Sequence, residues 1–296
     1  MSETPTARPR SVVWWSGALV VASVFWAGGG LVAKSAPMSG PQFALWRSLG
    51  GAATYQTALL VTGRRPRLAH LRAAAMGGVG FGLGVLFLFA AFKSTTLTSA
   101  NVINALQPIL LGIAATRLHH VVLSKAAVAA MAVAVAGTIV VVAGSTGGGS
   151  WSLHGDLLAA AGVVVSCLYP LGTKSARRTL DALEYQAACL WVSAAVCLVG
   201  VLIIDGRPIE PTASGWLSVA GIVAVGGTGH LIFSWAQHHV SVAASSVVLL
   251  VEIAVSAVGA AVFFDQPIGA VQVLGMAIVG VGIVAWVRAE AGTLPA

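Results

Sequence analysis

The stretch TSANVINALQPILL, residues 98–111, has a counterpart later in the same chain. With a constant shift of 145 residues, Gln107 aligns with Glu252 and Gly137 aligns with Gly282. The same register carries residues 98–140 onto residues 243–285. Two matching segments at a fixed separation indicate an internal repeat.

A second match lies upstream of the first. The tripeptide Lys-Ser-Ala at residues 34–36 recurs at residues 174–176, a shift of 140 residues. The two matches together place the repeat boundary near residue 148, inside a segment rich in glycine and serine. We therefore expect a first repeat over residues 1–147 and a second over residues 148–296.

The composition indicates an integral membrane protein. Of the 296 residues, 57% are hydrophobic and only 8% are charged, whereas soluble domains carry roughly 25% charged residues. The formal net charge of +7 could suggest nucleic acid as a partner. The basic residues, however, lie in the short gaps between apolar segments, as they do in membrane proteins. We therefore expect a lipid bilayer and no nucleic acid as the partner.

Spanning a bilayer as a helix takes about 20 apolar residues. Ten segments meet this length, with approximate bounds 12–33, 41–62, 73–92, 97–116, 124–144, 155–173, 184–204, 214–236, 241–263 and 267–287. Five fall in each repeat. The sequence thus predicts an all-α membrane protein of ten transmembrane helices in two five-helix repeats.

Lysine and arginine residues orient these spans, because they are enriched in cytoplasmic loops. With the N-terminus in the cytoplasm, the inner loops and ends hold Arg8, Arg10, Arg64, Arg65, Arg67, Arg72, Arg117, Lys125, Lys174, Arg177, Arg178 and Arg288. The outer side holds only Lys34, Lys93 and Arg207. Twelve against three predicts a protein of the cell (inner) membrane with both termini in the cytoplasm.

An odd number of spans per repeat has a direct consequence. The second repeat must begin on the opposite side of the membrane from the first, so the two repeats are inverted. Inverted repeats are common in secondary transporters, which bind substrate near the membrane midplane between the repeats. The architecture thus favours a transporter.

Longer motifs strengthen this interpretation. The run AAFKSTTLTSANVINALQPIL at residues 90–110 is matched by HHVSVAASSVVLLVEIAV at residues 238–255. The pattern FFDQPIGAVQVLG follows at residues 263–275, with Asp265 before the last span and Gln272 and Gly275 inside it. These motifs resemble those of the EamA-type transporters of the drug/metabolite transporter superfamily. Two departures from the family pattern are His120 at the acidic loop position and Glu252 without the proline that usually follows it.

The resemblance implies a carrier that works by alternating access and is often driven by protons. It also implies a cavity lined by the first, third, fourth, sixth, eighth and ninth spans. Family members move amino acids and related metabolites, and others move nucleosides, sugar-related compounds or drugs. We expect export of amino acids or related compounds, with a nucleoside, sugar-related or drug carrier as the alternative.

Glu252 is the foremost candidate site residue. It falls midway along the ninth span, where a carboxylate is costly and tends to face a cavity or a partner. One interpretation is a site that binds a proton or the ammonium group of a substrate. The alternative is a structural acid that hydrogen-bonds to neighbouring helices.

The fourth span carries a row of amides. Asn101, Asn104 and Gln107 recur at a spacing of three, which places them along one helical face. Each amide needs hydrogen-bond partners, so this face must avoid lipid. It could line a substrate cavity, or it could bond to other helices.

Four further residues are weaker candidates. Trp26 in the first span and Tyr169 in the sixth could stack on a substrate, although many membrane aromatics only pack. His230 could titrate near neutral pH, but a packed, hydrogen-bonded histidine is the stronger interpretation. Ser245 could extend the polar face that leads to Glu252. For Arg47, near the outer end of the second span, we expect a side chain that extends to the membrane interface.

Several classes of function lack their residues. The chain has no Gly-x-x-x-x-Gly-Lys-Ser/Thr loop for ATP, no His-Glu-x-x-His and no Gly-x-Ser-x-Gly. The three cysteines lie in apolar segments without metal-ligand spacing. We therefore expect no enzyme, no catalytic residue, no metal and no cofactor, but a small-molecule substrate and a role for protons. A lipid-handling enzyme or a non-catalytic scaffold are alternatives of a different class. Monomer and homodimer both stay open.

Overall fold

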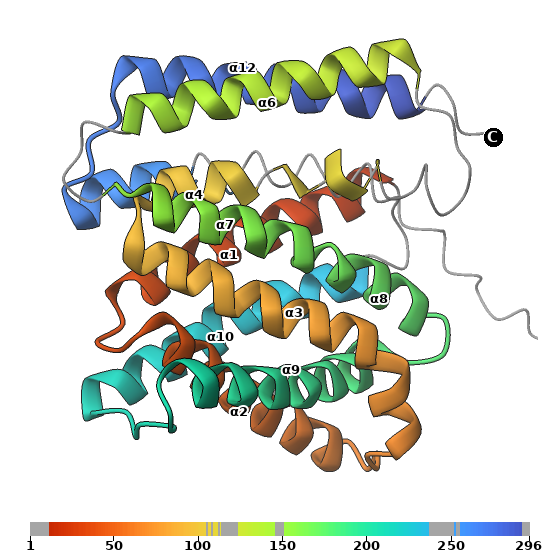
Figure 1. Ribbon diagram of the computed structural model, residues 1–296. Helices are drawn as coiled ribbons and strands as arrows, with labels where there is room; N and C mark the ends of the chain where they lie inside the picture. Colours follow the sequence, from red (N-terminus) through yellow and green to blue (C-terminus); the bar gives the residue numbers. More distant parts are fainter. Residues whose placement is uncertain are drawn as a thin grey trace, which may run out of the picture.

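The computed structural model describes residues 12–104, 106, 107, 109–111, 113, 124–145, 151–236, 252 and 255–291. Throughout these residues the regular structure is α-helical. The helices are α1 (Val12–Ser35), α2 (Gly40–Val61), α3 (Leu68–Ser94), α4 (Leu97–Asn104), α6 (Lys125–Ser145), α7 (Leu153–Ser166), α8 (Leu168–Ala176), α9 (Ala182–Ile204), α10 (Ala213–Ala236) and α12 (Ala270–Ala291). They run side by side in one bundle (Figure 1).

Where the structure describes them, the predicted spans correspond to helices. Parts of the fourth predicted span, 97–116, and residues 241–251 of the ninth, 241–263, lie outside the described residues. Six helical segments are long and apolar enough to cross a membrane, and shorter apolar helices cover residues 97–111, 255–264 and 270–282. The predicted all-α fold with two five-helix repeats is therefore confirmed. The sixth predicted span differs in one respect, because it is divided at Cys167 into α7 and α8.

The pairing of helices follows a two-fold relation between the repeats. Helix α1 packs against α10, and α3 packs against α7 and α8. In repeat terms these pairs are the first span with the eighth and the third with the sixth, so exchanging the repeats converts one pair into the other. Helix α2 packs against α9 and α6 packs against α12 (Figure 1), and each of these pairs converts into itself.

Glycines show the same relation at atomic level between α6 and α12. A Cβ atom added at Gly137 would lie 2.6 Å from the backbone nitrogen of Val279, and one added at Gly282 would lie 2.6 Å from that of Ala134. The shift of 145 residues converts the first contact into the second. The sequence repeat is thus matched by a repeat of contacts.

The two repeats are also inverted. Near the end of α1, Lys34 donates a hydrogen bond to the carbonyl oxygen of Thr95 over 2.7 Å. Thr95 in turn donates through its hydroxyl to Asp156, 2.9 Å away in the first turn of α7. The first helix of one repeat therefore ends where the first helix of the other begins. We call this side of the bundle the Asp156 end.

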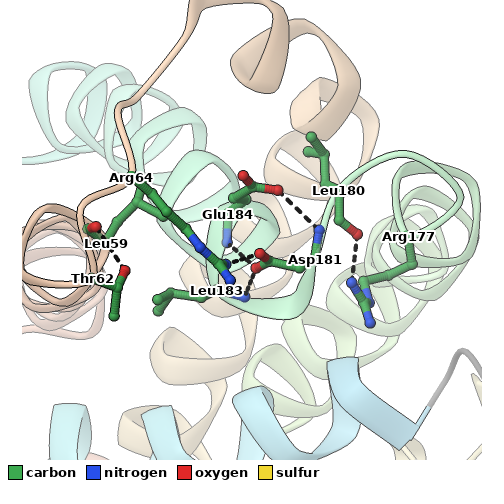
Figure 2. Close-up of polar contacts among 8 residues, drawn as sticks. All are labelled: Leu59, Thr62, Arg64, Arg177, Leu180, Asp181, Leu183 and Glu184. Atoms are coloured by element: carbon green, nitrogen blue, oxygen red, sulfur yellow. Dashed lines mark hydrogen bonds and ion pairs between the residues drawn. The ribbon is translucent and has the colours of Figure 1, made fainter. Parts of the chain in front are cut away.

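The opposite side of the bundle, the Arg64 end, has its own polar contacts. Arg64, after α2, forms an ion pair with Asp181, which also caps α9 (Figure 2). The Asp181 carboxylate accepts hydrogen bonds from the backbone nitrogens of Leu183 and Glu184 over 2.8 and 2.9 Å. Arg177 donates to the carbonyl oxygen of Leu180 in the same turn (Figure 2). Polar networks at both ends thus bracket the apolar middle of the bundle.

Helix α3 approaches its neighbours closely because of its glycines. Gly78 and Gly82 face α9, where an added Cβ would lie 2.5 Å from Val192 and 2.9 Å from Val196. On another face, Gly80 and Gly84 meet α8 and α7, where Cβ atoms would lie 2.5 Å from Leu168 and 2.9 Å from Ser166. Small residues let transmembrane helices pack this tightly. Helix α3 therefore holds the α7–α8 break beside the centre of the bundle.

Candidate functional site

A cavity of about 120 Å³ lies at the centre of the bundle between the two repeats. That volume holds several water molecules, so polar groups at its wall can be hydrated. Its wall comes from α1, α2, α3 and α4 of the first repeat and from α7, α8, α10 and Glu252 of the second. The lining residues are Trp26, Gly29, Gly30, Arg47, Phe81, Gly84, Val85, Leu88, Phe89, Phe92, Asn104, Gln107, Ser166, Tyr169, Ile222, Gly226, His230 and Glu252.

Most of the residues singled out from the sequence lie at this cavity. Glu252, Asn104 and Gln107 line it, as do the three ring-bearing residues Trp26, Tyr169 and His230. Asn101 does not line it, and Ser245 lies outside the described residues. The contributing spans are the six that the family resemblance implies, and Arg47 adds the second span.

The break between α7 and α8 places Tyr169 at the cavity. Its hydroxyl lies 3.2 Å from Nδ1 of His230 and accepts a hydrogen bond from Nε2 of Gln186 over 3.1 Å. The same Gln186 nitrogen donates to the carbonyl oxygen of His230 over 2.9 Å. Sequence reasoning missed Gln186, although a buried amide in an apolar span is itself a signal of a polar partner.

This network assigns a tautomer to His230. A carbonyl oxygen only accepts, so the Gln186 atom that faces it must be the amide nitrogen. Because that nitrogen also donates to Tyr169, the tyrosine hydrogen is left for Nδ1 of His230. The imidazole then carries its own hydrogen on Nε2, as an N–H donor. No other assignment pairs the phenol hydrogen within this network.

Aromatic rings surround the imidazole. The Trp26 ring lies 4.9 Å from that of His230, and the Phe81 ring meets it edge-on at 4.8 Å. The Tyr169 and Phe233 rings stack with centroids 6.0 Å apart. Packed rings hold His230 in place and make this wall of the cavity suited to flat or apolar ligand groups.

The amide row of the fourth predicted span splits into three different roles. Gln107 donates to the hydroxyl of Ser166 over 2.9 Å and so links the repeats at the cavity wall. Asn104 lines the cavity. Asn101 is buried with 4% of its surface exposed, and its side-chain polar atoms have no hydrogen-bond partner among the described residues. Of the three amides, Asn104 and Gln107 reach the cavity and Asn101 does not.

Arg47 corrects one expectation. Instead of extending to the membrane interface, its side chain is buried with 5% exposed and lines the cavity. Its guanidinium carbon lies 4.4 Å from the centre of the Phe81 ring, a cation–π contact. The position is seven residues into α2, about 10 Å along the helix, and α9 and α3 cover it on two sides. The packing of these helices keeps the side chain from reaching the interface, and the sequence alone does not show that packing.

The described side chains at the cavity wall offer hydrogen bonds and aromatic contacts to a ligand. The described residues include no group of three or more histidine, cysteine, aspartate or glutamate side chains suited to a metal ion. The three cysteines are buried and unpaired with one another. The wall offers N–H donors, amides, one carboxylate and aromatic faces.

Comparisons with known proteins agree with this architecture. The EamA-like transporter family matches residues 13–143 and 153–288, one match in each repeat. A solved structure, described only as the crystal structure of a protein, superposes with a TM-score of 0.66 at 20% sequence identity. That superposition covers 93% of this chain and 96% of the other, which shows a shared fold. No curated protein sequence matches the chain.

Proposed function

Because this chain belongs to the EamA-like transporter family, we propose that it exports amino acids or related compounds by alternating access. The chain is a multi-pass membrane transporter and not an enzyme. The observation that carries the proposal is the central cavity, to which both inverted repeats contribute polar and aromatic side chains. Rocking one repeat against the other would open such a cavity to each side in turn.

The amino-acid assignment is supported by the chemistry of the wall. Glu252 suits an ammonium group, the amides of Asn104 and Gln107 suit polar groups, and Trp26 with Tyr169 suits a side chain. Flux of labelled amino acids into proteoliposomes tests the assignment, with nucleosides, sugars and amphiphilic drugs as the comparison panel. Flux of nucleosides and none of amino acids would favour the alternative substrate class. No flux of any solute in the panel would refute both substrate classes.

Proton coupling is a further part of the proposal, assigned to Glu252. The carboxylate lies at the cavity and not in a loop. At the cavity, substrate and proton can reach it in the same conformational state of the carrier. We predict that Glu252→Gln abolishes transport driven by a pH gradient while the protein is still produced in the membrane. The measurement is substrate flux with and without the gradient. Glu210→Gln, at an exposed position, is the matched control. Unchanged flux and pH dependence in Glu252→Gln would refute the assignment.

The placement in the membrane completes the proposal. We assign the protein to the cell (inner) membrane with both termini and the Arg64 end in the cytoplasm, on the strength of the lysine and arginine distribution. The repeats are assigned to residues 1–147 and 148–296, as a monomer or homodimer.

A further inference from the structure

We propose that Arg47 binds an anionic carboxylate group of the transported molecule, so that the substrates of this carrier are carboxylates. The inference rests on the proposed function of the central cavity and names the chemical group that the cavity selects. It depends on the side chain of Arg47, on the donors that share its wall, and on the charge of the surroundings.

The guanidinium is buried and incompletely paired. Arg47 is 95% buried, and its Nη1 atom has no hydrogen-bond partner among the described residues. Among the described residues, the ionisable side chains that act on it electrostatically are Tyr55, Tyr169, Cys189, Cys197 and His230. Phenols and thiols are neutral at physiological pH and an imidazole is never an anion, so none of these groups balances its charge.

The nearby carboxylate does not balance it either. Arg64 with Asp181 is the one ion pair formed among the described residues, which include both Arg47 and Glu252. Arg47 and Glu252 thus line one cavity without an ion pair between them. A buried cation without a paired anion is costly in a membrane protein. A carboxylate in the cavity would supply the missing partner.

The geometry of Arg47 suits this role. The guanidinium carbon of Arg47 lies over the Phe81 ring, 4.4 Å from its centre. A guanidinium carries its N–H groups in one plane, and two of them match the two oxygens of a carboxylate. Lysine has no equivalent planar pair of donors, which makes the choice of arginine informative.

Two other N–H donors share the same wall. Trp26 lines the cavity, and its indole Nε1 has no hydrogen-bond partner in the part of the chain that the structure describes. His230 lines the cavity with Nδ1 engaged by Tyr169, which leaves the Nε2 hydrogen as a donor. Donor groups of Arg47, Trp26 and His230 around one space form a site for an anionic oxygen ligand.

Three aromatic probes of matched shape test the proposal. They are phenylalanine, 3-phenylpropanoate, which lacks the amino group of phenylalanine, and phenethylamine, which lacks its carboxylate. Binding is measured by tryptophan fluorescence of the purified full chain. We expect Arg47→Gln to weaken the binding of phenylalanine and 3-phenylpropanoate by about 10- to 100-fold. The affinity for phenethylamine should stay within about twofold of the wild type. Arg47→Lys should restore only part of the loss, and Arg207→Gln, at an exposed position, should change nothing.

The outcomes separate this inference from the proposed function. Retained phenethylamine binding shows that Arg47→Gln is folded, and thermal unfolding provides a second check of the fold. Equal affinity of the wild type and Arg47→Gln for 3-phenylpropanoate would overturn the inference, as would failure of the wild type to bind either acid. Phenylalanine flux that survives Arg47→Gln would overturn the inference and uphold amino-acid transport. Arg47-dependent binding of 3-phenylpropanoate without amino-acid flux would uphold the inference and refute the amino-acid assignment.

Discussion

Asp156 is a buried carboxylate that serves the structure rather than the cavity. Its Oδ1 atom accepts hydrogen bonds from the hydroxyls of Thr95 and Ser99, both over 2.9 Å, and Oδ2 accepts one from the indole of Trp151 over 2.7 Å. Three donors from both repeats thus converge on one side chain, of which 5% is exposed. It ties the corner between α3 and α4 to the start of α7.

At the residue scale, we predict that Asp156→Ala destabilises the protein by about 2–4 kcal/mol, because it leaves buried donors without an acceptor. Thermal unfolding in detergent is the measurement. Asp265→Asn is the control, since Asp265 is exposed and has a positive φ of 50° that asparagine tolerates equally well. An Asp156→Ala variant as stable as the wild type would show that the network contributes little.

At the scale of elements, the tightest test of the repeat is the contact between α6 and α12. A Cβ at Gly137 or at Gly282 would lie only 2.6 Å from a backbone nitrogen of the other helix. Backbone atoms cannot move aside as a flexible side chain can, so the helices must separate.

We predict that Gly137→Ala and Gly282→Ala each lower the free energy of unfolding by about 1–3 kcal/mol. The two losses should be similar, because a two-fold relation makes the two contacts equivalent. Thermal unfolding measures both variants beside Gly17→Ala, where an added Cβ meets nothing within 4 Å. A large loss at one glycine and none at the other would contradict the equivalence.

At the scale of the whole molecule, the inverted repeats set which ends share a side of the membrane. Arg65 and Arg207 are both exposed. Replacing either one by cysteine and labelling with a membrane-impermeant maleimide shows on which side of the membrane that position lies. The native thiols are buried and will not compete. We predict that Arg207→Cys is labelled in intact spheroplasts and that Arg65→Cys is labelled only after permeabilisation. The reverse pattern would invert the assigned orientation, and labelling of both from outside would contradict the inverted topology.

Much of the architecture was predictable because it depends on one-dimensional properties of the chain. Runs of apolar residues partition into lipid wherever their neighbours lie, and so the ten spans and the five-plus-five division followed from hydropathy and from the shift that pairs Gln107 with Glu252. The family followed from the same motifs. Glu252, Asn104, Gln107, Trp26, Tyr169 and His230 were chosen because polar or aromatic groups in an apolar span need a special environment.

The roles of Arg47, Gln186, Asn101 and Asp156 depended on packing in three dimensions. Which face of a helix meets a cavity, and which meets another helix, is set by neighbours distant in sequence. Helices α3 and α9 enclose α2 and keep Arg47 from the interface, while the break at Cys167 turns Tyr169 toward His230. Hydropathy therefore placed the helices in the membrane, and the close contacts between helices assigned a polar residue either to the cavity or to the scaffold around it.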